Sequence, residues 1–308
     1  LAYDEILSTF LVHSEIRKNI KKIKKEKKIF NLKNQNKILE KLEFELTNDQ
    51  KKSLNEINID LSSNQKMFRL LQGDVGSGKT IVALCAAYNV VKSGFQVAIL
   101  APTEILARQH YNFAKKIFDR SLNLEILSGK LQYKDKKIIT KKLSDHKVDI
   151  VIGTHAIFQK KIIFKKLGLI IIDEQHKFGV NQRKKLSDKG GDNCDVLLMS
   201  ATPIPRTLTM TIFGDMDLSI IKEKPKSRIE VKTYTKLENK IDDVLKFVTK
   251  EISFGNQIFW VCPLIELSKK IDHSSAISKY DFLNKKFPNQ VGLLHGRTDM
   301  ETKEKILN

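Results

Sequence analysis

Residues 73–80, GDVGSGKT, have the residue types and the spacing of a phosphate-binding loop. Glycines let the backbone wrap around an anion with its N–H groups turned inward, and a following helix N-terminus adds positive potential. Lys79 would then reach the β- and γ-phosphates, and the Thr80 hydroxyl would bind Mg²⁺. The motif predicts a nucleotide site made of Gly73, Asp74, Val75, Gly76, Ser77, Gly78, Lys79 and Thr80.

An acidic pair, Asp173 and Glu174, directly follows the aliphatic run LGLIII. In a chain without a phosphate loop, such a pair could simply be the polar end of a strand. Here a phosphate loop precedes it, and an Asp at this place can hold Mg²⁺ while the adjacent Glu polarises the attacking water. We therefore expect a catalytic pair. Gln175 and His176 come next, beside the expected γ-phosphate position, so we expect them to couple the nucleotide to the rest of the chain.

Three further loops offer hydroxyl groups after apolar runs: LAPTEILARQH (100–110), VIGTHAIFQ (151–159) and SATPIP (200–205). Hydroxyls and helix N-termini suit the phosphates of a nucleic acid backbone rather than its bases. Each loop alone is a weak signal, since Thr103 could be only a helix N-cap. Their order along one chain makes the combination specific.

The elements that would position these loops are short apolar runs separated by polar segments of helical length. The runs are FRLLQ, QVAILA, LEIL, VDIVIG, LGLIII and DVLLMS. This alternation is typical of βαβ units and predicts an α/β fold with a mostly parallel sheet. Ligands of such sheets bind at the carboxyl ends of the strands, where the candidate residues fall. A charged, Pro-broken segment at 222–230 predicts a linker, and IEVKTYT, NQIFWVCP and VGLLHG predict strands of a second domain.

The composition indicates a polyanionic partner. The 308 residues include 55 Lys+Arg and 36 Asp+Glu, a formal net charge of +19. Such an excess favours nucleic acid. Eleven basic and two acidic residues lie between Arg17 and Lys41, in a predicted N-terminal helical linker. This stretch is either a solvated helix and linker or a DNA contact.

The sequence gives no sign of a membrane or secretory protein. The longest nearly apolar run, Ile81 to Val91, is too short to span a bilayer, and no signal peptide is apparent. The three cysteines are far apart, which supports neither a zinc site nor a disulfide framework. We expect a cytoplasmic protein.

The ordered set GDVGSGKT, APTEILARQH, GTHAIFQ, DEQHKFGV, SATPIPRTLTMTIFGDMDLSII and QIFWVCPLIE resembles the superfamily-2 DNA helicases, and among them the RecG family. The resemblance runs from about Phe44 to the end of the chain. It implies a RecA-like ATP-binding domain and the start of a second RecA-like domain. It also implies an ATP- and Mg²⁺-dependent translocase on double-stranded DNA that remodels stalled forks and Holliday junctions in repair and recombination.

The resemblance assigns roles to matching positions. It implies catalytic roles for Lys79, Asp173, Glu174 and His176, with Thr80 and Asp173 at the metal. Gln50 would contact adenine, with Phe44 nearby. Coupling of nucleotide to DNA is implied for Gln175, Ser200, Ala201 and Thr202. DNA contacts are implied for Thr103, Arg108, Thr154, His155, His295 and Arg297.

The resemblance also implies the domain order and what surrounds it. We expect a basic helical linker at 1–43, a first helicase domain at 44–222 and a partial second domain at 223–308. The family's wedge domain, which grips branched DNA, would precede residue 1. Motifs V and VI, with the arginine finger, would follow Asn308, so these residues alone should turn ATP over slowly. Lys177 departs from the Arg usual in the family.

The family further implies a nucleoid-associated monomer that single-strand DNA-binding protein could recruit. A transcription-repair coupling factor is the alternative, since that family shares TPIPRTL-like and FGV-like boxes, but Gln175 and APTEILARQH favour RecG. An ABC-type ATPase is disfavoured because LSGK at 127–130 lies too far before the acidic pair. A non-enzymatic DNA-binding module is disfavoured because both nucleotide motifs are intact.

Overall fold

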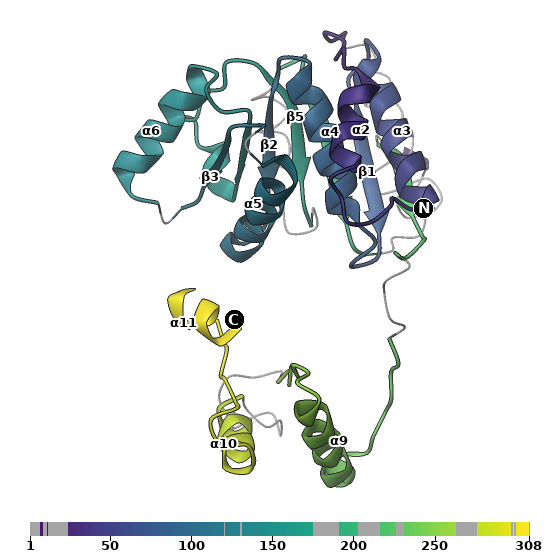
Figure 1. Ribbon diagram of the computed structural model, residues 1–308. Coiled ribbons are helices and arrows are strands. Elements are labelled where there is room, and N and C mark those ends of the chain that lie inside the picture. The colour runs from purple at the N-terminus through teal and green to yellow at the C-terminus, as the bar shows by residue number, and fades with distance from the viewer. Residues whose placement is uncertain are drawn as a thin grey trace. The chain divides into compact units, whose positions relative to one another are not determined.

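The chain divides into two compact units, Leu1–Ile229 and Glu230–Asn308 (Figure 1). The computed structural model describes residues 7–8, 11, 24–119, 121–129, 131–174, 191–202, 216–225, 231–262, 276–296, 298 and 300–307. Residues 24–43, predicted as part of a separate linker, belong to the first unit. The predicted boundary at 222/223 falls shortly before the division between the units. The three-part division of the chain stays a prediction.

The described strands of the first unit form one seven-stranded sheet in the order β3-β4-β2-β5-β6-β1-β7. The strands are β1 (Phe68–Gly73), β2 (Gln96–Leu100), β3 (Leu124–Leu127), β4 (Ile150–Gly153), β5 (Leu167–Ile172), β6 (Asp195–Ser200) and β7 (Asp217–Ile221). All pairs in the sheet are parallel. The predicted α/β class with a mostly parallel sheet is therefore confirmed.

The described helices of the first unit include α2 (Leu32–Leu39), α3 (Asn48–Ser62), α4 (Lys79–Lys92), α5 (Glu104–Phe118) and α6 (Tyr133–Ser144), with a 3-10 turn η1 (His155–Phe158). Helices α4, α5 and α6 follow β1, β2 and β3 as the βαβ pattern requires, whereas α2 and α3 precede β1. None of the helices in the described part of the chain is long and apolar enough to cross a membrane.

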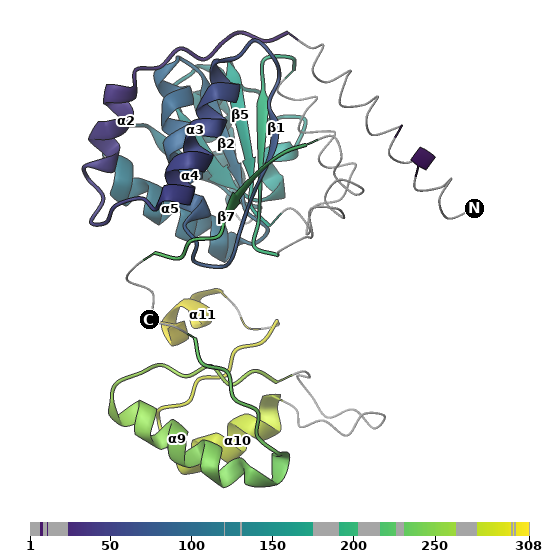
Figure 2. The ribbon, with the colours of Figure 1, turned by 90° about the vertical axis from the view of Figure 1, so that its right-hand side faces the viewer.

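The core has two layers, one on each face of the sheet. Successive side chains of a strand point to opposite faces, so Ile171 packs in the cluster with α3, α4 and α5, whereas Ile172 packs in the cluster with α6. Figure 2 shows α3, α4 and α5 gathered on one side of the strands. Both faces are thus covered over β1, β2, β4, β5 and β6, which explains why these strands read as largely apolar runs.

From Ile81 to Val90, helix α4 is apolar apart from Asn89, and every residue of this stretch is buried. A helix of this kind must be covered on all sides. The sheet covers one side of α4, and α3 and α2 pack on the others. The loop that precedes α4 is consequently attached to the most deeply buried helix of the unit.

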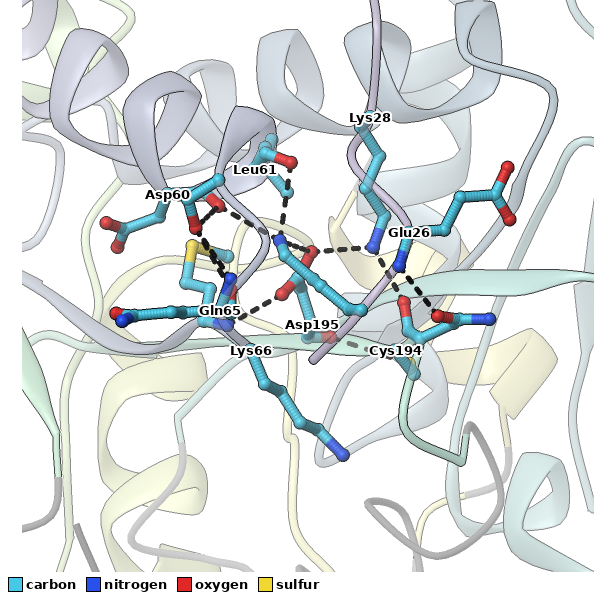
Figure 3. A network of polar contacts seen from close by, with 12 residues as sticks. Glu26, Lys28, Asp60, Leu61, Gln65, Lys66, Cys194 and Asp195 are labelled. Carbon is cyan, nitrogen blue, oxygen red and sulfur yellow. Dashed lines mark hydrogen bonds and ion pairs between the residues drawn. The ribbon is translucent and has the colours of Figure 1, made fainter. Parts of the chain in front are cut away.

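The segment before α2 is fastened to the sheet by a buried ionic cluster. Asp195 Oδ2 accepts hydrogen bonds from Lys25 Nζ at 2.6 Å and from Lys28 Nζ at 2.8 Å. All three side chains are 0% exposed. Asp195 Oδ1 accepts from the Met67 backbone N–H at 2.7 Å. Figure 3 shows Lys28 and Asp195 pointing toward each other.

These contacts change the interpretation of the basic N-terminal stretch. Burial lowers the pKa of Lys25, and the charge of Asp195 opposes that effect. The backbone N–H groups of Lys25 and Lys28 also bond to the Asn64 and Leu61 carbonyls. For Lys25 and Lys28, neither a solvated position nor a DNA contact is correct, because both are internal structural cations.

The second unit contains a 3-10 turn η3 (Glu238–Lys240) and the helices α9 (Ile241–Ser253), α10 (Ala276–Lys286) and α11 (Met300–Leu307). Its predicted strands do not form in the part that the structure describes, where 231–237, 256–262 and 291–295 carry no strand. A strand needs a neighbour for its hydrogen-bond ladder. These described runs have none, and Val261 is accordingly 87% exposed.

Candidate nucleotide and DNA site

The phosphate-binding loop joins β1 to α4, as the motif predicts. Gly76 and Gly78 have φ values of 75° and 87°, in the left-handed region that glycine adopts readily. Gly78 is the N-cap of α4, so the first N–H groups of a buried helix open into the loop. Lys79 Nζ donates to the Gly73 carbonyl at 2.6 Å and to the Asp74 carbonyl at 3.0 Å. The loop is therefore built as an anion cradle with its cation in place.

Lys79 is a buried cation near three carboxylates. Burial lowers its pKa, whereas the charges of Asp173, Glu174 and Asp74 raise it. The net effect is a lowered pKa, because desolvation disfavours the charged form. An anion bound at the loop would favour the protonated form of Lys79.

Gln50 connects the start of α3 to the phosphate loop. Its Nε2 donates to the Ser77 carbonyl at 2.7 Å, and its Oε1 accepts from the Thr47 N–H at 3.0 Å. Thr47 and Gln50 form a capping box, the reciprocal pair that satisfies the first N–H groups of a helix. A Cβ at Gly78 would lie 2.2 Å from Gln50 Nε2. Gln50 is thus held against the loop and is 1% exposed.

The acidic pair stands at the end of β5, next to the loop. Asp173 is buried, and its backbone N–H continues the ladder to the Leu100 carbonyl of β2 at 2.8 Å. Glu174 has a φ of 49°, an uncommon conformation for a residue other than glycine. Its N–H donates to Asp173 Oδ1 at 3.0 Å. Such outliers cluster at functional sites, where surrounding contacts maintain them.

His110 is the site residue that the motifs did not single out. Its Nε2 lies 2.7 Å from Asp173 Oδ2, and the ring is buried on α5. One sequence signal could have found it: Ala107, Ala114 and Ile117 mark the buried face of α5, and position 110 falls on that face. A histidine within an apolar stripe needs a polar partner, and here the partner is the predicted metal ligand.

An open pocket of about 570 Å³ brings these groups together. Its lining includes Phe44, Gln50, Val75, Gly76, Gly78, Lys79, Thr80, His110, Asp173, Glu174 and Ala201. Phe44 is 46% exposed, so its ring is open to a ligand. Predicted adenine-side, phosphate-side and catalytic residues therefore meet in one cavity, although Gly73, Asp74 and Ser77 are not among those that line it.

The oxygen donors at this pocket fit Mg²⁺. The Thr80 hydroxyl and the Asp173 carboxylate both line it. Mg²⁺ prefers hard oxygen ligands and keeps several water molecules, so it needs only one or two protein ligands beside substrate phosphates. Thr80 and Asp173 would hold the ion there.

The predicted coupling motif begins at Ser200, the last residue of β6. Strand β6 pairs with β1, which leads into the phosphate-binding loop. Ser200 Oγ and Thr202 Oγ1 are 2.9 Å apart, and Gln72 Nε2 of β1 donates to the Thr202 carbonyl at 3.2 Å. Gln72 and Ser200 are register partners in adjacent strands. Hydrogen bonds thus connect this motif with the strand that leads into the loop.

The residues predicted to contact DNA follow β2 and β4, which are neighbours. Thr103 is the N-cap of α5 and accepts from the Leu106 N–H at 3.3 Å. Arg108 and His155 are exposed, and Thr154 is half-buried. The Arg108 side chain is 53% exposed, and its guanidinium lies 3.9 Å from the half-buried Glu104 carboxylate.

The remaining predicted residues are apart from this group or outside the described chain. His295 belongs to the second unit, where Thr298 Oγ1 accepts from its N–H at 3.1 Å. Gln175, His176, Lys177 and Arg297 lie outside the described residues.

The start of the predicted linker runs beside the nucleotide pocket. Asp49 Oδ2 accepts from the backbone N–H groups of Lys222 at 2.8 Å and Glu223 at 2.9 Å. These two hydrogen bonds lower the pKa of Asp49. Lys224 Nζ lies 3.6 Å from Asp74 of the phosphate loop, and Pro225 lines the pocket.

Comparisons with known proteins agree with this arrangement. RecG of Bacillus subtilis, an ATP-dependent DNA helicase, is 46% identical over 272 residues, which cover 87% of this chain and 40% of that protein. RecG of Aquifex aeolicus is 46% identical over 307 residues, covering 99% of this chain and 38% of that protein. The chain thus spans about two fifths of the curated relatives it matches.

A solved structure of RecG bound to a three-way DNA junction superimposes with a TM-score of 0.81. The two sequences are 38% identical. The match covers 99% of this chain and 40% of the RecG chain in that structure. The resemblance to the RecG family inferred from the motifs is confirmed. The DEAD/DEAH box helicase model matches residues 47–211, more than half of the chain, and the chain therefore belongs to the DEAD/DEAH box helicase family.

Proposed function

We propose that this chain is the motor part of an ATP- and Mg²⁺-dependent translocase on double-stranded DNA that remodels branched DNA in repair and recombination. The main observation behind this proposal is that the phosphate loop, the acidic pair and the Ser200–Thr202 motif lie together at the carboxyl ends of neighbouring strands. Relatives named as ATP-dependent DNA helicases, and a related structure bound to a DNA junction, support it.

The predicted site residues that line the pocket have distinct roles in this proposal. Gln50 and Phe44 contact the adenine, and Lys79 turns from the Gly73 and Asp74 carbonyls to the β- and γ-phosphates. Thr80 and Asp173 would hold Mg²⁺, which when bound supplies positive charge beside the phosphates. Glu174 orients and polarises the attacking water.

DNA contacts come from the loops after β2 and β4 and from the second unit. Thr103, Arg108, Thr154 and His155 contact the backbone in the first unit, and His295 and Arg297 in the second. Ser200 and Thr202, with Gln175 and His176, transmit the nucleotide state to these contacts. Backbone contacts without base contacts suit a motor that must move along any sequence.

The proposal extends to the oligomeric state, location and partners of the protein. We expect a monomer in the cytoplasm, associated with the nucleoid, with branched DNA as its substrate and single-strand DNA-binding protein as a partner. In this proposal the arginine finger is not among these 308 residues. Loss of such a finger costs about 10³–10⁵ in rate, so these 308 residues should hydrolyse ATP slowly.

Binding of a fluorescent ATP analogue to the 308-residue chain tests the nucleotide site. Lys79→Ala should weaken binding by at least about tenfold, because it removes a charge-assisted contact to phosphate. Lys115→Ala, which removes an exposed lysine of α5, is the matched control and should bind as the unaltered chain does. Equal binding by all three proteins would refute the nucleotide site.

The motor activity is tested with the product of the complete gene. Its ATP hydrolysis should be stimulated by a three-way junction more than by linear duplex of equal length, at one stated salt concentration. Lys79→Ala should abolish the stimulation. Hydrolysis that does not respond to any DNA would contradict the proposal.

A further inference from the structure

His110 occupies a position that the proposed function leaves without a role. It is buried on α5, lines the nucleotide pocket and has its Nε2 2.7 Å from Asp173 Oδ2. It lies two turns after Thr103, in a loop and helix otherwise assigned to DNA. One side chain thus connects the helix that starts at the DNA side with the carboxylate that would hold the metal.

The direction of this hydrogen bond follows from the chemistry of its partner. An ionised carboxylate can only accept, so the imidazole must carry a proton on Nε2 and donate it. The other oxygen, Asp173 Oδ1, accepts from the Glu174 N–H at 3.0 Å. Each oxygen keeps a lone pair, and both are fixed in direction by the protein. A carboxylate oriented in this way is ready to accept a hydrated cation.

The helix that carries His110 is itself placed by the sheet. Its N-cap hydroxyl, on Thr103, bonds to the Leu106 N–H, and its buried face packs on β3 and β4. Thr103 and His110 are about 10 Å apart along the helix axis, at about 1.5 Å per residue. A rigid shift of α5 at its DNA end therefore moves the donor that orients Asp173.

We propose that His110 is a positioning residue that orients Asp173 for Mg²⁺ and makes the metal site sensitive to the position of α5. This inference rests on the proposed function, since it assumes that nucleotide and Mg²⁺ bind at the phosphate loop. Partners that orient a metal ligand typically contribute about 10- to 100-fold to metal affinity or activity. The predicted effect lies in the Mg²⁺ dependence of binding.

The experiment compares His110→Ala, His110→Gln and the unaltered 308-residue chain. Each is titrated with a fluorescent ADP analogue, in EDTA and in excess Mg²⁺, and then with Mg²⁺ at fixed nucleotide. Gln can place an amide N–H near the position of the imidazole Nε2, whereas Ala cannot. Asn112→Ala is the control, because it removes an exposed polar residue from the same helix.

His110→Ala should bind nucleotide in EDTA within about twofold of the unaltered chain, and the Mg²⁺ concentration for half-maximal effect should rise about 10- to 100-fold. His110→Gln should recover most of that loss, and Asn112→Ala should show none. An unchanged Mg²⁺ dependence in His110→Ala would overturn the inference. The inference would also be overturned if His110→Ala and His110→Gln lost Mg²⁺ sensitivity equally and both bound nucleotide more weakly in EDTA. That result would indicate that His110 only packs.

Lys79→Ala, measured in parallel, separates this inference from the proposed function. If Lys79→Ala binds nucleotide normally, the nucleotide site itself is wrong. If Lys79→Ala loses binding while His110→Ala keeps its normal Mg²⁺ dependence, only the role of His110 is wrong. Thermal unfolding of every variant shows whether the fold is intact.

Discussion

Replacing Asp195 with Asn should destabilise the first unit by about 3–5 kcal/mol, because removal of one partner leaves buried charge without compensation. Asp195 Oδ2 accepts from two ammonium groups, Lys25 Nζ at 2.6 Å and Lys28 Nζ at 2.8 Å, with all three side chains 0% exposed. An Asn retains an oxygen for the Met67 N–H but turns its amide N–H₂ toward the two lysines. Three donors would then face one another in a dry site.

Hydrogen exchange of the β1 and β6 amides measures this loss within the first unit. A change of 3–5 kcal/mol corresponds to faster exchange by about two to four orders of magnitude, at 1.4 kcal/mol per tenfold. Asp192→Asn, an exposed neighbour, should change stability by less than about 0.5 kcal/mol. A loss below about 1 kcal/mol in Asp195→Asn would refute the reasoning about buried charge.

Two further readouts separate charge from packing. Adding Lys25→Met and Lys28→Met to Asp195→Asn should restore much of the stability, because apolar replacement of a whole buried ionic cluster is often neutral. The deficit of Asp195→Asn alone should also shrink as the pH rises. Removing the carboxylate lowers the pKa of Lys25 further below 10.5, so the unfolded chain binds more protons and stability increases with pH in that window. A deficit that grows with pH would contradict this sign.

Two other predictions concern single residues of the first unit and the reactivity of thiols. Gly78→Ala should weaken nucleotide binding at least about tenfold, since a side chain at φ 87° is strained by about 1–2 kcal/mol and its Cβ would lie 2.2 Å from a glutamine amide nitrogen. Gly94 has a similar φ of 81°, but a Cβ built there would meet no atom within 4 Å. Gly94→Ala should therefore lower the melting temperature about as much as Gly78→Ala does, yet bind nucleotide normally. Burial raises the pKa of both Cys85 and Cys194 to about 12, so only half-buried Cys262 should react with a thiol reagent before unfolding. Rapid reaction of all three cysteines in the native chain would contradict that prediction.

Most of the sheet could be predicted because five of its strands, β1, β2, β4, β5 and β6, are buried on both faces and therefore read as largely apolar runs. The edge strand β3, in which only Leu127 is buried, is still marked by the short run LEIL. The edge strand β7 could not be predicted, because DLSII mixes polar and apolar residues and only Ser219 and Ile221 are buried. The strands predicted for the second unit do not form in its described part. An apolar run predicts a strand only where a neighbouring strand completes its ladder, and the run itself does not reveal the neighbour.

In the candidate site, too, some residues could be predicted from the sequence and others could not. The phosphate loop and the acidic pair are local motifs, so their placement at the sheet edge followed from the order of the elements. His110 and Lys25 were missed because each has its meaning through a distant partner, Asp173 and Asp195 respectively. A lysine in a run of lysines looks solvated unless the fold places a carboxylate against it.

The hold of Asp49 on the linker also gives the nucleotide pocket part of its wall. Asp49 Oδ2 fixes the backbone of Lys222 and Glu223, and the two residues that follow reach the pocket. Lys224 Nζ lies 3.6 Å from Asp74, and Pro225 lines the cavity. Asp49→Asn would weaken two charge-assisted hydrogen bonds and so loosen this part of the wall without touching a catalytic group.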